Sequence, residues 1–440
     1  MTTPRPRLAR LAVAAVMVPL LATQTPAHAE GLPLDSRLCQ PLPSTPATQI
    51  PTMWHLERLR MQQVWQLATG EGVTIAVIDT GTSPLNSALL DPQKVTTLNY
   101  VPLEDEETLT PRGVGDSEQG ISCAHGTSVT SLIVGTPGVD TRTSYSGIAP
   151  GARVLAMRAL RAQVDDEGAA QKEDPRHTVE AINDAVARKV DIINISQAMS
   201  EGTPEYAAAI KNAIDHGIVV VAAAGNGSQK LRGPAYPAAY PGVIAVGLSN
   251  PQDIAPAGSG HSDPAMEITV AAPGVGVLAL GPTRAPAAGR TSQQDLLTNQ
   301  SYVSGTGTSY STPIVSGVVA LMLQRDPELT PAQVKQRLIE TADPPVGAVP
   351  DPYLGHGVVN PLRALTGPAA PTAGHPSSST SPEAIPAREP LTTDRSGMTT
   401  ALIATAGALL LAGGGLLLKL VIPAADKRGY RPAAPPRPRN

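Results

Sequence analysis

The sequence predicts an α/β fold in which a parallel β-sheet is covered by helices on both faces. Short, nearly continuous apolar runs recur along the chain, and such runs are typical of parallel strands, because both faces of these strands are buried. Between them lie runs whose apolar residues recur at helical spacing. Alternation of strands and helices in this manner indicates a parallel α/β sheet.

Five apolar segments are predicted to form strands: 73–79 (VTIAVID), 153–160 (RVLAMRAL), 190–196 (VDIINIS), 217–225 (GIVVVAAAG) and 242–248 (GVIAVGL). Helices are predicted at 177–189, where Ile182, Ala185 and Val186 share one face, and at 204–216. Active groups in such sheets lie at the carboxyl ends of the strands. Polar residues at those ends are therefore the first candidates for a functional site.

The composition limits both the core and the partners. The chain of 440 residues contains no Phe, and 2% of its residues are aromatic, so the core must be built from Ala, Val, Ile and Leu. Residues 71–365 are numerous enough for one large domain. The net charge is −4, and the region between the two ends of the chain is more acidic than the whole. This charge argues against nucleic acid as a partner and against binding to anionic lipid headgroups.

Both ends of the chain carry targeting features. Residues 1–29 are predicted to be a secretory signal peptide, with basic residues, a short apolar run and a small-x-small cleavage pattern; an ordinary N-terminal helix is the alternative. Residues 398–422 are predicted to be a transmembrane helix, because 399–418 carry no charge and are long enough to cross a bilayer. The basic residues of 423–440 predict a cytoplasmic tail and an extracytoplasmic domain.

Two further segments flank the large domain, an N-terminal extension at 30–70 and a Pro/Ser-rich linker at 366–397 that acts as a spacer. The two cysteines, Cys39 and Cys123, predict one disulfide, since an even pair in an exported chain is typically bridged. The alternative is a metal site built on Cys123 and His125, but further Cys and clustered His are missing as ligands. We therefore predict no metal and no cofactor.

Four polar residues stand where this fold places its site. Asp79 ends the first predicted strand, Asn226 follows the fourth, His125 opens a helical segment, and Ser309 precedes a buried apolar run. Taken singly, each has a structural explanation, because Asp and Asn are common turn residues and Ser is a favoured helix N-cap. A serine at a helix N-terminus is also placed to be a nucleophile, since the free backbone N–H groups there favour negative charge.

Together the four residues fit one mechanism, acyl transfer at a serine. Ser309 attacks a carbonyl, His125 takes the proton and later returns it, and Asp79 holds the imidazole. Asn226 donates its side-chain amide to the oxyanion, with the backbone N–H of Ser309 as a second donor. The order Asp–His–Ser, without a G-x-S-x-G around Ser309, excludes an esterase of the α/β-hydrolase type.

The motifs VTIAVIDTG, HGTSV, INIS, VVVAAAGNG, YPAAYPGVIAVG and GTSYSTPIVSGVVALML follow one another in the order of the subtilase family, which the chain resembles over residues 54–365. The resemblance implies a subtilisin-like fold and a serine endopeptidase with the triad Asp79, His125 and Ser309 and with Asn226 in the oxyanion hole. It also implies polypeptide substrates that pair with the backbone after INIS. The predicted substrate-binding residues are Asn194, Ile195, Ser196, Gln197, Ala198, Ala223, Ala224 and Gly225.

Some positions depart from the family pattern. Ser128 stands where the family often has a second His, which is not a triad member. Gln197, Ala198 and Met199 replace the usual Leu-Gly-Gly, and the added side chains are predicted to narrow the pocket for the residue before the scissile bond. The chain shows no convincing match to the calcium ligands of the family, so calcium dependence is not expected from the sequence.

The signal peptide, the cysteine before HGT, the linker and the C-terminal anchor together resemble the mycosins, the membrane-anchored subtilases associated with type VII secretion in actinobacteria. This resemblance implies a protease anchored in the cell membrane that processes secreted substrates and supports the secretion membrane complex. Two alternatives stay open: a structural subunit with dispensable protease activity, and a general surface-processing subtilase. Polar insertions at 101–122, 161–177 and 281–300 are surface loops or partner-binding loops.

Overall fold

The computed structural model describes residues 32–33, 53–83, 87–101, 123–160, 175–226, 234–256, 267–282 and 301–367. The chain divides into two units, Met1–Pro371 and Thr372–Asn440, and every described residue belongs to the first. The predicted signal peptide, most of the linker, the predicted transmembrane helix and the basic tail lie outside the described residues. Within the described ranges, no helix has the length and apolar character needed to span a membrane.

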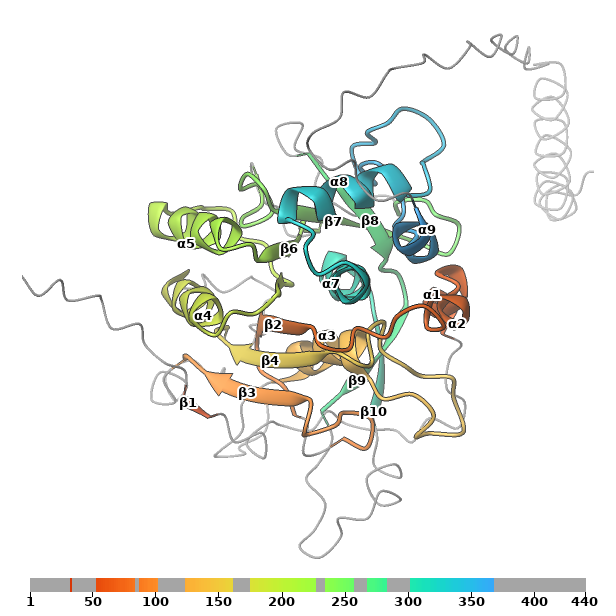
Figure 1. Ribbon diagram of the computed structural model, residues 1–440, viewed down its shortest axis with the longest axis horizontal. Coiled ribbons are helices and arrows are strands. Elements are labelled where there is room, and N and C mark those ends of the chain that lie inside the picture. Colours follow the sequence, from red (N-terminus) through yellow and green to blue (C-terminus); the bar gives the residue numbers. More distant parts are fainter. Residues whose placement is uncertain are drawn as a thin grey trace, which may run out of the picture. The chain divides into compact units, whose positions relative to one another are not determined.

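A sheet with the strand order β1-β3-β4-β2-β5-β6-β7-β8 forms the centre of the first unit (Figure 1). Its strands are β1 Leu32–Pro33, β2 Thr74–Asp79, β3 Val95–Asn99, β4 Arg153–Arg158, β5 Ile192–Ile195, β6 Val219–Ala223, β7 Ile244–Ser249 and β8 Val270–Pro273. All neighbouring strands are parallel except β1, which is antiparallel to β3. A second sheet consists of the antiparallel pair β9 Val277–Gly281 and β10 Ser301–Gly305.

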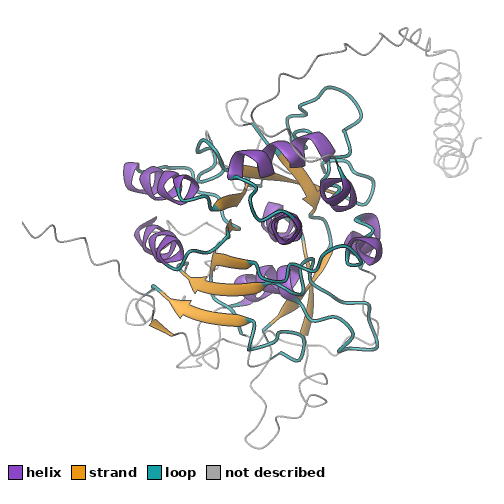
Figure 2. Cartoon of the chain, in the orientation of Figure 1, coloured by secondary structure: helices purple, strands orange, loops and turns teal. Residues whose placement is uncertain are grey.

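Helices cover both faces of the large sheet (Figure 2). They are α1 Trp54–Arg58, α2 Met61–Val64, α3 Ala124–Val134, α4 Pro175–Ala187, α5 Pro204–Asp215, α7 Thr308–Arg325, α8 Pro331–Thr341 and α9 Pro361–Thr366. Helices α4 and α5 lie on one face, whereas α3 and the long α7 lie on the other (Figure 1). This is the predicted α/β architecture.

The apolar character of the strands follows from this arrangement. In β2, Ile75 and Val77 belong to the core that contains α3 and α7, whereas Ala76 and Ile78 belong to the core that contains α4 and α5. Successive side chains of a strand point to opposite faces, so a strand between two helical layers must be apolar at every position. Burial on both faces is thus the physical reason why the sequence pattern identified the strands.

The five predicted strands are confirmed as β2, β4, β5, β6 and β7, each within about two or three residues at either end. The predicted helices 177–189 and 204–216 are α4 and α5. Because α4 begins at Pro175, the last residues of the insertion predicted at 161–177 belong to a helix and not to a loop. Strands β3, β8, β9 and β10 were not predicted. In β3 (VTTLN) and β10 (SYVSG), polar residues interrupt the apolar run by which the other strands were identified.

The second half of the N-terminal extension belongs to the folded domain. Met53, Leu56, Leu59, Met61 and Val64 are buried in the same core as α3 and α7. Apolar side chains at these positions explain why α1 and α2 pack against the domain although each is too short to be stable alone. The chain before Met53, including Cys39, is outside the described residues apart from β1.

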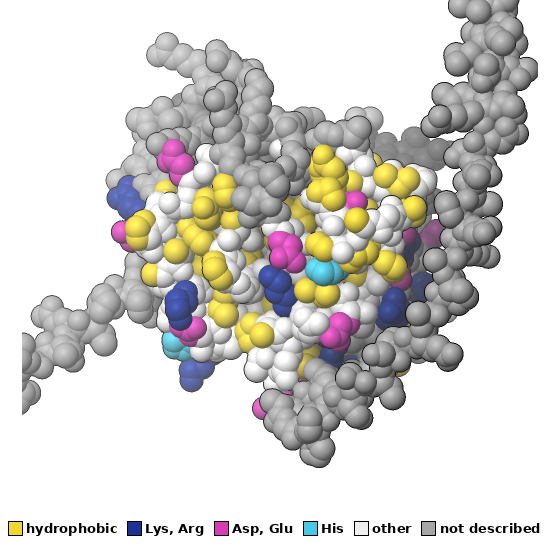
Figure 3. Space-filling view, turned by 90° about the horizontal axis from the view of Figure 1, so that it is seen from above, with side chains coloured by type: hydrophobic (Ala, Val, Ile, Leu, Met, Phe, Trp, Pro, Cys, Tyr) yellow, Lys and Arg dark blue, Asp and Glu magenta, His cyan; other side chains and the backbone are white. Residues whose placement is uncertain are grey.

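The surface of the domain is mixed in charge. On the face drawn in Figure 3, acidic and basic side chains are interspersed among apolar ones. Among the described residues, three of the large apolar side chains that are exposed, Val346, Val349 and Tyr353, lie in the connection between α8 and α9. Single exposed apolar residues are ordinary features of soluble domains.

Candidate active site

Asp79 is the last residue of β2, at the carboxyl end of the sheet. Strand β2 lies between β4 and β5, at the point where the order of strands reverses, and ligands of such sheets bind outside the carboxyl ends at that point. The Asp79 side chain is only 1% exposed, and its Oδ1 accepts a hydrogen bond of 2.7 Å from the Thr80 backbone N–H. A buried carboxylate of this kind needs a partner.

Two glycines bring the start of α3 against the end of β2. A Cβ atom at Gly126 would lie 2.1 Å from the Gly81 carbonyl oxygen, so the two backbones are in direct contact. Gly81 has a φ of 99°, a conformation that glycine adopts without steric cost. The Thr80 hydroxyl accepts a hydrogen bond of 3.0 Å from the Gly126 N–H. This backbone contact places the residue before Gly126 beside Asp79.

That residue is His125, in the first turn of α3. Its Nδ1 lies 2.8 Å from Asp79 Oδ1 and 3.0 Å from Asp79 Oδ2, and the imidazole is 19% exposed. Burial of the ring lowers the pKa of His125, but the charge of Asp79 and its hydrogen bond raise the pKa by more, so that it lies above the ordinary value. The pair holds the imidazole with Nδ1 toward the carboxylate and Nε2 directed away from it.

Ser309 is the second residue of α7, directly after the Gly-Thr dipeptide that begins the helix. Gly307 is the N-cap residue, with a φ of 153°, and it accepts a hydrogen bond of 3.0 Å from the Tyr310 N–H. A Cβ at position 307 would lie 3.4 Å from Ser309 Oγ, so glycine leaves the approach to the hydroxyl open. The buried remainder of α7 fixes Ser309 in position, and the free N–H groups of its first turn favour negative charge nearby.

Asn226 follows β6 through Gly225, which has a φ of 90°. Its side-chain Oδ1 accepts hydrogen bonds from the Thr308 backbone N–H at 3.0 Å and from the Thr308 hydroxyl at 3.3 Å. The opposite atom of the amide, Nδ2, lies 3.2 Å from the place where a Cβ of residue 307 would be. The amide is therefore oriented with its oxygen on Thr308 and its donor nitrogen beside Gly307, next to the Ser309 hydroxyl.

The structure brings all four predicted residues into one site at the carboxyl ends of β2 and β6 and the start of α7. His125 contacts α7 through the ring of Tyr310, whose centroid lies 5.9 Å from the imidazole centroid. Among the described residues, His125 and Ser309 are not directly hydrogen-bonded. Catalytic hydrogen bonds are often long before substrate binds and shorten in the complex.

The predicted substrate-binding segments border this site, but most of their side chains point away from it. Asn194 is fully buried, donating to Ser196 Oγ at 3.0 Å and accepting from Ser316 Oγ of α7 at 2.8 Å. Gln197 donates from Nε2 to Thr178 Oγ1 at 3.3 Å. Ile195, Ala223 and Ala224 are buried as well. Any contact with substrate at these positions is thus made by backbone, and their substrate-binding role stays a prediction.

Ala198 and Met199 are half-buried and pack against the core that contains α4 and α5. Met199 forms an isolated antiparallel bridge with Tyr236, with hydrogen bonds of 2.8 Å in both directions. This bridge fixes the backbone of residue 199 at the edge of the predicted cleft. The volume that the Met199 thioether takes up beside this edge depends on side-chain rotation, so the narrowing of the pocket stays a prediction.

Cys123 is buried at the start of α3 and is disulfide-bonded. Its predicted partner Cys39 lies outside the described residues, so the pairing of Cys39 with Cys123 stays a prediction. In the part of the chain that the structure describes, no three His, Cys, Asp or Glu side chains come together as ligands for a metal ion. No described residue is therefore assigned to a metal.

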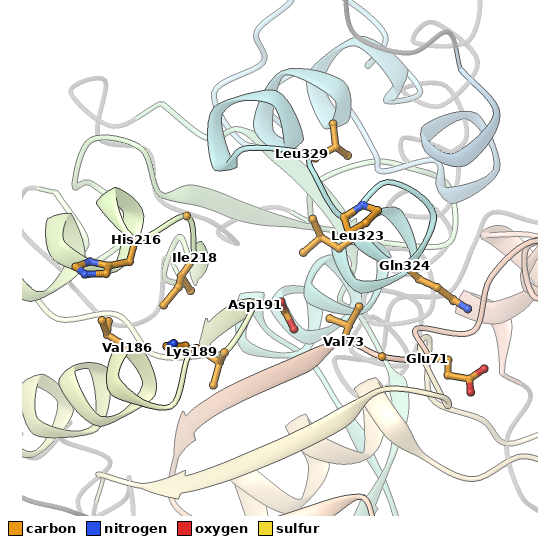
Figure 4. A pocket seen from close by; sticks show the side chains of 14 residues that line it. Glu71, Val73, Val186, Lys189, Asp191, His216, Ile218, Leu323, Gln324 and Leu329 are labelled. Atoms are coloured by element: carbon orange, nitrogen blue, oxygen red, sulfur yellow. The ribbon is translucent and has the colours of Figure 1, made fainter. Parts of the chain in front are cut away.

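A cavity of about 500 Å³ opens at the other end of the sheet (Figure 4). It lies at the starts of β2, β5 and β6 and the end of α7, where Asp191, His216 and Gln324 line it. Asp191 Oδ2 accepts a hydrogen bond of 2.7 Å from the Thr74 N–H, and Gln324 Oε1 accepts one of 2.7 Å from the Gly70 N–H. None of the predicted catalytic residues lines this cavity, so its size does not identify it as the active site.

Two residues near the site were missed from the sequence. Thr308 orients the Asn226 amide, and Tyr310 contacts the His125 ring. Both lie next to Ser309 in GTSYSTP, so their neighbourhood was visible in the sequence. Their partners were not, because Asn226 is far from Thr308 along the chain and only the folded sheet brings them together.

The fold and the site define a serine endopeptidase on an α/β scaffold. A family model described as the subtilase family matches residues 70–363. The chain therefore belongs to the subtilase family.

Among curated relatives, the chain is similar to mycosins. It is 32% identical to Mycosin-1 of Mycolicibacterium smegmatis over an alignment that covers 71% of this chain and 72% of the relative. It is 31% identical to Mycosin-4 of Mycobacterium tuberculosis, where the alignment covers 80% of this chain and 78% of the relative. The recognition of a mycosin-like subtilase from its motifs is thus confirmed.

Similar solved structures also come from proteins of this kind. MycP1, described as a serine protease and an essential component of the type VII (ESX-1) secretion system, is 28% identical with a TM-score of 0.55, covering 77% of this chain and 92% of that one. A chain of the periplasmic assembly from the ESX-5 inner membrane complex is 27% identical with a TM-score of 0.55, covering 82% of this chain and 94% of that one. These likenesses support association of such proteases with a secretion complex.

Proposed function

We propose that the chain hydrolyses peptide bonds with Asp79, His125 and Ser309 as its catalytic triad and with Asn226 in its oxyanion hole. One observation carries the proposal. A buried carboxylate holds His125 Nδ1 at 2.8 Å, while the Asn226 amide nitrogen and the Ser309 hydroxyl flank the same glycine, Gly307. An imidazole with a fixed tautomer, a hydroxyl at a helix start and an oriented amide donor are the parts that acyl transfer needs.

In the first step, Ser309 Oγ attacks the carbonyl carbon of the scissile peptide bond. His125 Nε2 takes the hydroxyl proton, and the resulting imidazolium is stabilised by the ionised Asp79 at its Nδ1–H. The negative charge that develops on the carbonyl oxygen is met by Asn226 Nδ2–H and by the backbone N–H of Ser309. Because Thr308 holds Asn226 Oδ1, the donor nitrogen is oriented before the charge develops.

In the following steps, His125 returns its proton to the leaving amine, and the C–N bond breaks to leave an ester on Ser309. Water then attacks this acyl-enzyme, with His125 as general base, and Ser309 recovers its proton when the second tetrahedral intermediate collapses. The products are a new carboxylate and a new amine, and the enzyme returns to its starting state.

The proposed setting is the outer side of the cell membrane. The predicted signal peptide at 1–29 and the predicted transmembrane helix at 398–422 support an extracytoplasmic domain with a short cytoplasmic tail. The similarity to a chain of the ESX-5 inner membrane complex supports a place in a type VII secretion complex, where the enzyme processes secreted polypeptides. The alternative is a structural subunit whose protease activity is dispensable.

One experiment separates the two roles. Cells that carry Ser309→Ala are compared with cells that lack the whole chain, and both the secretion and the processing of substrates are measured. Under the proposal, Ser309→Ala abolishes processing. If secretion continues with Ser309→Ala but stops in the deletion, the chain also has the structural role. If processing continues with Ser309→Ala, the proposed nucleophile is wrong.

A second experiment tests the location. A reporter that is active only in the cytoplasm is fused after residue 440, and a protease is added to intact cells from which the outer layers have been removed. The proposal expects a reporter that stays active while the catalytic domain is degraded. A catalytic domain that survives until the membrane is opened would contradict the predicted topology.

A further inference from the structure

Tyr310 directly follows the nucleophile Ser309 and contacts the catalytic histidine. Its ring meets the His125 ring edge to face, with the centroids 5.9 Å apart and the planes at 81°. Edge-to-face pairs within this range of distances are attractive, because the positive edge of one ring lies over the negative face of the other. The contact is made on His125 from α7, whereas Asp79 holds the same imidazole from β2.

The Tyr310 ring is held rigidly from a second direction. A Cβ at Gly305, the last residue of β10, would lie 2.0 Å from two atoms of the Tyr310 ring. The ring therefore rests directly on the backbone of β10, and only glycine permits it to do so. A side chain that lies against a strand backbone in this way has little freedom to rotate.

The hydroxyl end of Tyr310 lies near Ser128 of α3. Ser128 Oγ itself donates to the Leu280 carbonyl of β9 at 2.9 Å. Burial raises the pKa of Tyr310, so its hydroxyl stays protonated and able to donate at neutral pH.

We propose that Tyr310 is a positioning residue that sets the orientation of the His125 imidazole. The hydrogen bond to Asp79 fixes one ring atom, Nδ1, but a single attachment leaves the ring able to tilt about it. The Tyr310 ring, held against the backbone of Gly305, supplies a second contact that restricts this tilt and keeps Nε2 toward Ser309. The proposal rests on the proposed triad.

The inferred support of His125 consists of Tyr310 and of Gly305, on which the tyrosine ring rests, and we call it the Tyr310 brace.

The test compares variants of the full-length protein on a peptide substrate. Tyr310→Leu removes the ring, and we expect kcat to fall by about 10–100-fold with KM unchanged, because small misplacements of a catalytic group cost rate and not binding. Tyr310→Phe keeps the ring and is expected to restore kcat to within about fivefold of wild type.

Gly305→Ala provides a matched control for the geometry. The added methyl displaces the ring of Tyr310, so kcat should fall as it does in Tyr310→Leu. In the Tyr310→Leu background the same change should cost nothing further, because the clashing ring is gone. An additive loss would mean that position 305 acts independently of Tyr310, and it would overturn the brace.

A spectroscopic readout separates positioning from general damage. The His125 Nδ1 proton in its bond to Asp79 gives a far-downfield proton NMR signal when the ring is held still. The titratable groups that face His125 among the described residues are Asp79 and Tyr310. We expect the signal to persist in Tyr310→Phe and to broaden in Tyr310→Leu at unchanged thermal unfolding.

The outcomes are distinct from those of the triad. If Ser309→Ala still cleaves the peptide, the proposed function fails. If Ser309→Ala is inactive but Tyr310→Leu keeps kcat within twofold and keeps the NMR signal, the brace alone is wrong. Should Tyr310→Leu prove unfolded, Gly305→Ala and its double variant with Tyr310→Phe still decide, since a displaced ring must lower kcat in both.

Discussion

The two ends of the central sheet carry different kinds of polar contact. At the carboxyl ends, polar side chains contact one another across elements, as Asp79 does with His125 and as the Asn226 amide does with the Thr308 hydroxyl. At the amino ends, the side chains in the cavity of Figure 4 mostly bind backbone, as Asp191 does with Thr74. Contacts between side chains orient these groups, and the contact with Asp79 raises the pKa of His125. Contacts with the backbone instead satisfy hydrogen-bonding groups at the ends of strands.

This difference between the two ends of the sheet indicates where a catalytic site is expected in such a fold. The cavity at the amino ends is a clear hollow, but its polar side chains Asp191 and Gln324 accept hydrogen bonds from backbone N–H groups. The end with the proposed active site instead contains the hydrogen-bonded pair of Asp79 and His125, and an oriented amide, that of Asn226, beside Gly307. Alignment of hydrogen-bonding groups, rather than empty volume, distinguishes the end of the sheet where we propose the active site.

The largest expected effect is the loss of the nucleophile. Ser309→Ala should lower kcat by roughly 10⁶-fold, the scale known for removing this group from a subtilisin. His125→Ala should cost about as much, and the double variant little more, because the triad acts as a unit. Single-turnover kinetics with a peptide substrate and an unchanged unfolding temperature would check it. Additive losses would show that the two residues act separately.

The next largest effect on activity is expected from the pair of Asp79 and His125 at the end of β2. The His125 imidazole must be neutral to accept a proton, so kcat/KM should fall as the pH drops through its raised pKa. Asp79→Asn removes the charge that raises this pKa and should lower kcat by about 10⁴-fold. Rates measured from about pH 5 to about pH 9 should show the acidic limb moving to lower pH in the variant. A limb that stays in place would mean that a group other than His125 titrates.

A smaller loss is expected at the oxyanion hole. Asn226→Ala should lower kcat by about 10²–10³-fold with little change in KM, a magnitude known from the equivalent change in subtilisin. Thr308→Val makes a matched comparison, since it keeps the backbone N–H bond to Asn226 and loses only the hydroxyl bond. A change in KM alone would place Asn226 in ground-state binding.

Substrate choice should change by less. Ala198 and Met199 stand where the family usually has glycine, and their volume should favour small residues, Ala above all, before the scissile bond. A misfit of this size is worth roughly 10–200-fold in discrimination. Profiling on a peptide library should show the preference, and Ala198→Gly should relax it. Best cleavage after Tyr or Phe in the wild type would contradict the reading of this pocket.

The smallest effect is expected at the amino ends of the strands. Asp191→Ala removes the bond to the Thr74 N–H and should lower the free energy of unfolding by about 0.5–1.5 kcal/mol. His216→Ala, on an exposed side chain of the same cavity, should change stability less. Both variants should keep kcat/KM within about twofold of wild type. A large loss of activity would show that the two ends of the sheet are coupled.

Much of this architecture could be predicted from the sequence. Strands β2, β4, β5, β6 and β7 were recognised because burial on both faces leaves a continuous apolar run. The four proposed catalytic positions were singled out because each follows an identifiable strand or begins an identifiable helix, and because one mechanism requires all four residue types. The structure adds that Asp79 and His125 are in direct contact.

The remaining features depend on contacts that a linear pattern does not contain. Strand β10 was missed because its SYVSG is short and mixed in polarity, although it carries the glycine on which Tyr310 rests. Asn194 was expected in the cleft because its motif borders it, but its amide is used to bind Ser316 in the interior. Whether a polar side chain turns inward or outward depends on its partners in three dimensions.

The contact between Gly126 and Gly81 determines how the enzyme can diverge. Because the contact is made by backbone atoms, side chains around it can be exchanged by evolution without moving His125. The two glycines cannot be exchanged: a methyl group at position 126 would overlap the Gly81 carbonyl, and Gly81 has a φ of 99°. A duplicated copy that kept Asp79, His125 and Ser309 but acquired alanine at position 126 would be a pseudoenzyme with an intact triad in its sequence.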